Sequence, residues 1–68
     1  MAAMTGTITT LVVAKGFGFI RGEDAREYFF HRSGLTGVSF DELTVGQAVE
    51  FEGEDAAKGP RAMTVRRA

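Results

Sequence analysis

Lys15-Gly16-Phe17-Gly18-Phe19-Ile20 is the stretch of sequence that decides the fold. Alternate side chains of an extended strand point to the same side, so Phe17 and Phe19 share one face and Ile20 lies on the other with the glycines. Glycine behind the two rings lets a sheet curl tightly and lets neighbouring elements pack close. The stretch therefore predicts a strongly curved β-strand that carries two aromatic rings on one side.

A second aromatic segment, Tyr-Phe-Phe-His at residues 28–31, begins thirteen positions after Lys15. By the same alternation Phe29 and His31 share a face, and the other two residues share the opposite one. If the two segments form a hairpin, Phe29 and His31 join Phe17 and Phe19 in one patch. The alternative register would turn Tyr28 and Phe30 outward. We favour the first register because it completes an apolar core of Ile8, Ile20, Phe30, Val49, Phe51 and Val65.

Short apolar segments separated by Gly, Asp, Glu or Ser recur every 8–12 residues or so, which favours an all-β sandwich or barrel. We expect strands at residues 6–13, 16–21, 27–31, 47–54 and 61–67. In the fourth of these, Val49 and Phe51 alternate with Glu50, Glu52 and Glu54. The long connection after the third strand has room for a helical turn near Ser33 and a loop around Phe40. The predicted fold class is an all-β, five-stranded antiparallel OB-fold barrel, whose closure removes exposed strand edges.

Length and composition narrow the possible functions. The 68 residues have no cysteine and a single histidine, His31, so we expect one domain over residues 1–68 with no metal site and no cofactor. No apolar run is long enough to span a bilayer, and the first residues lack the features of a secretory signal. These absences predict a cytoplasmic protein. No nucleophile or carboxylate pair stands beside His31 in a recognisable motif, so we expect neither catalysis nor a small-molecule substrate.

The charge balance argues against a uniformly basic nucleic-acid binder. The formal net charge is −1 and the isoelectric point is about 5.7, whereas a pI above ~9 is the usual mark of that class. Binding that depends mainly on stacking bases against aromatic rings remains compatible with this composition. For a single strand phenylalanine, burial in the core is the simpler expectation, but the aliphatic residues listed above already fill the inward positions.

The sequence resembles the cold-shock domain family from about residue 5 to residue 66. The residues that carry the resemblance are Gly6, the segment at 15–20, Phe29-x-His31, Leu43-x-x-Gly46-Gln47-x-Val49-x-Phe51 and Lys58-Gly59-Pro60. The first aromatic segment matches that family's first ribonucleoprotein motif, and Phe29-x-His31 belongs to its second. The resemblance implies a monomeric five-stranded barrel that binds single-stranded RNA and DNA. It also implies an RNA chaperone or a regulator of transcription or translation in the cold-stress response.

The family's binding roles carry over to residues that match its motifs: Lys15, Phe17, Phe19, Phe29, His31, Phe40 and Lys58. Two departures change the expected surface. The family commonly has Lys, Trp, an aromatic residue and Asn where this chain has Thr-Thr-Leu-Val at residues 9–12, so the stacking tryptophan is replaced by Thr10. The residue after His31 is commonly Phe and is Arg32 here, whose guanidinium plane can stack on a base and pair with phosphate. We therefore add Arg32 to the expected binding residues.

Two other hypotheses compete with this one. An RNA-recognition motif also uses a Lys-Gly-Phe-Gly-Phe segment, but it needs two amphipathic helices that this sequence lacks. Alternatively, the barrel serves as a protein-interaction module with weakened or lost nucleic-acid binding, which the missing tryptophan and the acidic pI favour. Retention of both aromatic segments together with Lys15, His31 and Lys58 argues for nucleic acid.

Overall fold

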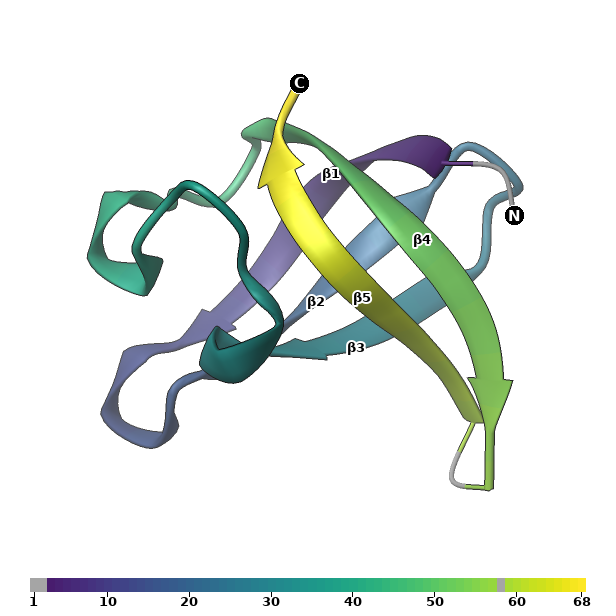
Figure 1. The fold of residues 1–68 in the computed structure, drawn as a ribbon, viewed down its shortest axis with the longest axis horizontal. Helices are drawn as coiled ribbons and strands as arrows, with labels where there is room; N and C mark the ends of the chain where they lie inside the picture. Colours follow the sequence, from purple (N-terminus) through teal and green to yellow (C-terminus); the bar gives the residue numbers. More distant parts are fainter. Residues whose placement is uncertain (1–2, 58) are drawn as a thin grey trace.

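Five strands form a closed barrel (Figure 1), and the β-branched and aromatic residues that favour strands are most frequent in the first three of them. The computed structural model describes residues 3–57 and 59–68. The strands are β1 (Ala3–Val12), β2 (Phe17–Gly22), β3 (Glu27–His31), β4 (Ala48–Ala56) and β5 (Gly59–Arg67), and the 3₁₀ turns between them are η1 (Val13–Lys15), η2 (Arg32–Gly34) and η3 (Phe40–Glu42). Within the described ranges, no helical turn approaches the length and apolarity that crossing a membrane requires.

The strands follow the order β1-β2-β3-β5-β4 around the barrel, and β4 pairs with β1 to close it. Four of these pairings are antiparallel, but β3 and β5 run parallel. The predicted OB-fold-like barrel is confirmed, whereas a purely antiparallel arrangement is wrong. The reason is geometric: strand directions cannot alternate all the way around a closed ring of five, so at least one neighbouring pair must be parallel.

The five predicted strands are all present, with ends that differ by a few residues. β1 starts at Ala3 and β5 at Gly59, both earlier than the pattern indicated, so Pro60 lies inside β5 opposite Asp55. In the long connection, the predicted helical turn near Ser33 is η2. Phe40 begins η3 instead of lying in an irregular loop. Figure 1 shows this connection folded out along one side of the barrel.

The barrel interior holds the side chains predicted for it. Ile8, Ile20, Phe30, Val49, Phe51 and Val65 are each at most 1% exposed, and Tyr28, Phe40, Leu43 and Ala62 complete the core. Gly18 makes this packing possible, because a Cβ at that position would lie 2.4 Å from the Thr10 carbonyl oxygen and 2.9 Å from the Phe30 ring. The glycine between the two outward rings is therefore required by close packing from two sides.

An irregularity in β1 decides which of its side chains face outward. Ile8 pairs with Ile20 in β2, but the next pair joins Thr10 to Phe19, so Thr9 is an extra residue on the β1 side. Such a bulge bends the strand and changes the direction of the side chains that follow. As a result, Thr10 lies beside Phe19 on the outer face, whereas Ile8 and Ile20 pack inside.

Candidate nucleic-acid interface

The hairpin of β2 and β3 brings three phenylalanine rings together on the outer face of the barrel. Phe17 pairs with His31 and Phe19 pairs with Phe29. The ring centroids of Phe17 and Phe29 lie 5.5 Å apart, those of Phe19 and Phe29 lie 5.9 Å apart, and those of Phe17 and Phe19 lie 6.3 Å apart. The side chains of Phe17, Phe19, Phe29 and His31 are only partly buried, and together they are here called the aromatic surface. The predicted register is thus confirmed.

A row of side chains crosses four strands through the middle of this surface. Thr10 of β1 is opposite Phe19, Phe19 is opposite Phe29, and Phe29 is opposite Arg61 of β5. Neighbours in such a row stand on the same face of the sheet. The threonine therefore occupies the end of the row where the cold-shock pattern leads us to expect tryptophan, and an arginine occupies the other end.

Beside the aromatic surface lies a groove of about 830 Å³ that reaches the turn between β4 and β5. Its lining includes Phe19, Phe29, His31, Ser33, Ala56, Ala57, Gly59, Pro60 and Arg61. The sequence prediction did not include Arg61. Alternation with the buried Ala62 places Arg61 on the outside of its strand, but only the parallel pairing of β3 with β5 brings it next to Phe29.

Two of the expected basic residues lie near the opposite end of the aromatic surface. Lys15 ends η1 and is exposed. The Arg32 backbone N–H donates to the Gly16 carbonyl at 2.8 Å, and a Cβ built on Gly16 would lie 2.9 Å from Arg32 Cδ. Since Gly16 has a φ of +73°, a larger residue would be strained there, and the Arg32 stem lies directly across it. Lys58, the third basic residue expected here, lies outside the described residues.

Ion pairing separates the basic residues into two groups. The pairs found among the described residues are Arg21 with Glu27, Arg26 with Asp55, Arg66 with Glu50, and Arg67 with Glu42. Within the same part of the chain, Lys15, Arg32 and Arg61 have no carboxylate partner. The cations around the aromatic surface and its groove are thus the ones left available to an anionic ligand, although the net charge is −1.

Phe40 does not lie on this surface, contrary to the sequence expectation. Its side chain is only 9% exposed, and its ring centroid is 6.1 Å from that of the buried Phe30. The turn η3 folds Phe40 back over one end of the barrel, where it adds to the core. Phe40 therefore belongs to the core in this structure and does not contribute to the aromatic surface.

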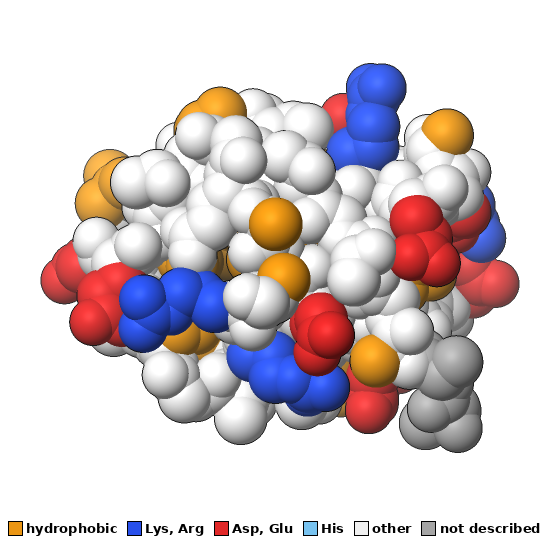
Figure 2. Space-filling model, turned by 90° about the horizontal axis from the view of Figure 1, so that it is seen from above, with side chains coloured by type: hydrophobic (Ala, Val, Ile, Leu, Met, Phe, Trp, Pro, Cys, Tyr) orange, Lys and Arg blue, Asp and Glu red, His pale blue; other side chains and the backbone are white. Residues whose placement is uncertain are grey.

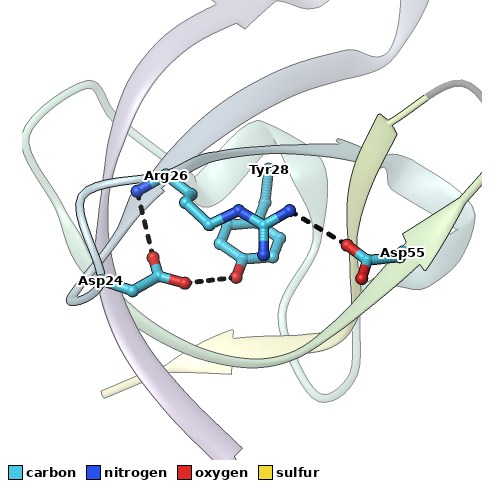
Figure 3. Close-up of polar contacts among 4 residues, drawn as sticks. All are labelled: Asp24, Arg26, Tyr28 and Asp55. Carbon is cyan, nitrogen blue, oxygen red and sulfur yellow. Dashed lines mark hydrogen bonds and ion pairs between the residues drawn. The ribbon is translucent and has the colours of Figure 1, made fainter.

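A polar network braces the turn of the β2–β3 hairpin (Figure 3). The Tyr28 hydroxyl donates to Asp24 at 2.6 Å, the Arg26 backbone N–H donates to Asp24 at 3.1 Å, and the Arg26 guanidinium donates to Asp55 at 3.0 Å. The hydrogen bond from Tyr28 lowers the pKa of Asp24, and the same bond raises the pKa of Tyr28. The pairing with Asp55 raises the pKa of Arg26. The network ties the hairpin to β4 and leaves the aromatic surface free.

A different face of the molecule has a mixed character. Seen from above Figure 1, basic and acidic side chains lie close to one another among mostly uncharged atoms, and hydrophobic atoms form small separate spots (Figure 2). This view therefore shows no extended basic area among the described residues. Nor do those residues include a group of three or more His, Cys, Asp or Glu side chains placed to hold a metal ion.

Comparison with known proteins identifies the family of this chain. Residues 4–68 match the family described as the 'cold-shock' DNA-binding domain. The chain is 44% identical over 62 residues to cold shock-like protein CspE of Bacillus anthracis, and these aligned residues cover 91% of this chain and 92% of that protein. It is 42% identical over 66 residues to cold shock-like protein CspC of Escherichia coli strain K12, covering 96% of each. This chain belongs to the cold-shock domain family of nucleic-acid-binding proteins.

Proposed function

We propose that the chain binds single-stranded RNA and DNA by stacking unpaired bases on Phe17, Phe19 and Phe29, with His31 at the edge of the stack. The observation that carries this proposal is the position of the three rings, which lie 5.5–6.3 Å apart on the outer face although the core is already filled by other residues. Clustered aromatic rings on a sheet face suit bases of any identity, because every base has a π-face.

Phosphate contacts come from Lys15, Arg32 and Arg61, the described cations without a carboxylate partner. Lys58 joins them as an expectation from the sequence alone. Three or four such contacts give a shallow salt dependence, because each phosphate neutralised on a single strand contributes about −0.7 to the slope of log K against log salt. With one stacking ring absent at Thr10, we expect micromolar affinity for short oligonucleotides.

Weak, sequence-tolerant binding to unpaired bases is suited to an RNA chaperone, which must release the strand after keeping it open. We propose this role for the chain, acting as a monomer, and through it an effect on transcription or translation. A hairpin RNA labelled with a fluorophore and a quencher tests it: the wild-type protein should open the hairpin. A protein that binds the single strand but never opens the hairpin would contradict the chaperone role.

The binding proposal is tested with fluorescein-labelled oligo-thymidine and oligo-uridine in an anisotropy titration at low salt. Phe29→Ala should weaken binding roughly 5- to 150-fold, since one stacked base contributes ~1–3 kcal/mol. Met63→Ala is the matched control, because Met63 is also an outward apolar residue, 40% exposed, but does not line the groove. Equal affinities for wild type and Phe29→Ala would contradict stacking. Complete absence of binding would favour the protein-interaction module instead.

A further inference from the structure

His31 caps the 3₁₀ turn that follows it with its own ring. The backbone N–H of Ser33 donates to Nδ1 of His31 at 3.2 Å, and the Ser33 hydroxyl oxygen lies 3.0 Å from the same nitrogen. His31 itself is extended, with φ −124° and ψ 154°, as is usual for a residue that precedes a helical turn. The ring nitrogen takes the place of the Ser or Asp oxygen that normally accepts this bond.

This contact determines where the neutral imidazole carries its proton. A backbone N–H can only donate, so Nδ1 of His31 must accept with its lone pair. A neutral imidazole has one N–H, and it therefore has to be on Nε2. In the other tautomer, or in the doubly protonated ring, Nδ1–H could donate to the Ser33 hydroxyl oxygen at 3.0 Å, but the Ser33 backbone N–H would then face an N–H and lose its acceptor.

The two residues of this cap lie on the ligand side of the molecule. His31 and Ser33 both line the groove beside the aromatic surface, together with Phe19, Phe29 and Arg61. Among the described residues, Nδ1 has the polar contacts given above and Nε2 has none. In a groove lined largely by aromatic and small side chains, the His31 ring thus has one nitrogen held by the cap and one nitrogen without a polar contact in the described residues.

Building on the nucleic-acid binding proposed above, we propose that the Ser33 amide is a positioning group that fixes His31 as the Nε2–H tautomer, which then donates to an oxygen acceptor of the bound strand. The face of the ring stacks while its edge donates, so His31 does more than a phenylalanine would at the same place. The acceptor is a keto oxygen of a base or a phosphate oxygen, and both share the chemistry that the donor recognises.

The tautomer is tested in the free protein, without any ligand. Long-range ¹H–¹⁵N correlation of the His31 ring at mildly alkaline pH should give a pyridine-type shift at Nδ1 and a pyrrole-type shift at Nε2. Ser33→Ala retains the amide and should keep this pattern. An ester bond in place of the amide at position 33, introduced by chemical synthesis of the chain, removes only the N–H and should abolish the preference. A proton on Nδ1 in the wild type would overturn the inference.

Binding tests the donor itself. His31→Phe keeps an aromatic ring and should bind oligo-thymidine roughly 2- to 12-fold more weakly, the range expected for one net hydrogen bond. A thymine isostere without oxygen acceptors should lose that same factor with wild type and nothing with His31→Phe if the acceptor is a keto oxygen. If the acceptor is a phosphate oxygen, methylphosphonate linkages should instead weaken binding by that factor with wild type and have no such effect with His31→Phe. If neither substitution distinguishes wild type from His31→Phe although the oligonucleotide binds, only this inference fails, whereas absence of all binding defeats the proposed function with it.

Discussion

Replacing Thr10 by tryptophan should convert this barrel into a much tighter binder. Thr10 is exposed and stands directly opposite Phe19, at the end of the row that continues through Phe29 to Arg61. Cross-strand neighbours have Cβ atoms only about 5 Å apart. An indole at position 10 therefore extends the aromatic surface by one ring, in the place where the sequence departs from the cold-shock pattern.

The size of the gain follows from the number of rings added. One base stacked on an aromatic side chain contributes ~1–3 kcal/mol, which corresponds to a roughly 5- to 150-fold lower Kd. Thr10 is outward, so the substitution leaves the core unchanged and should alter the free energy of unfolding by no more than about 0.5 kcal/mol.

The substitution also supplies its own probe, because the natural chain has no tryptophan. Titration of the Thr10→Trp variant with oligo-thymidine should quench the indole fluorescence, and calorimetry gives the Kd of both proteins on one scale. Thr7→Trp is the matched control, since Thr7 is also exposed on β1 but lies opposite Arg21 and outside the aromatic row. Equal affinity of the Thr10→Trp variant and the wild type, with an unquenched indole, would refute stacking along this row.

Four further predictions concern the core, the groove and the turn of the hairpin. Phe30→Ala should leave the chain largely unfolded in circular dichroism at 25 °C, because loss of a buried Phe costs about 3–5 kcal/mol and a domain this small has roughly that much in total; a cooperative melt near the wild-type temperature would contradict the core assignment. Arg61→Ala should reduce the salt slope of oligonucleotide binding by about 0.7, whereas Arg21→Ala, which removes a paired cation, should leave the slope unchanged. The pKa of Asp24 is lowered in the folded protein, so this carboxylate stabilises the fold above its ordinary pKa of 3.8 and loses that effect as the pH falls through the lower folded pKa. Asp24→Asn should therefore flatten the acid limb of stability against pH, measured by urea denaturation. The pKa of Tyr28 is raised, so its contribution to stability is present below pH 10.0 and is lost as the pH rises through the higher folded pKa. Absorbance of this sole tyrosine should show ionisation shifted to higher pH. A titration curve centred on 10.0 would contradict the hydrogen bond to Asp24.

Alternation along the strands predicted most of the site, because outward and inward positions are a local property of extended chain. Phe17, Phe19 and Phe29 were placed on one face, and Phe30 was placed in the core, from this pattern and the need to fill the barrel. The same need to fill the core selected the hairpin register that joins them. These predictions are confirmed by the pairing of Phe19 with Phe29 and by the burial of Phe30.

Features that depend on contacts between distant segments could not be predicted in the same way. Phe40 was expected on the surface, but whether a turn in a long connection folds inward depends on the space beside Phe30. Arg61 was missed because only barrel closure places β5 next to Phe29. The contact of Ser33 with Nδ1 of His31 likewise depends on the exact path of the chain after β3.

The central claim is that a single strand lies across the β2–β3 hairpin, and a map of amide shifts tests it most directly. Oligo-thymidine and oligo-uridine would be titrated into the ¹⁵N-labelled protein at low salt. We predict saturable shifts concentrated at residues 15–19 and 29–32 and at Arg61, with small changes at Asp24 and Met63. Shifts absent at millimolar ligand, or concentrated away from the hairpin, would contradict it.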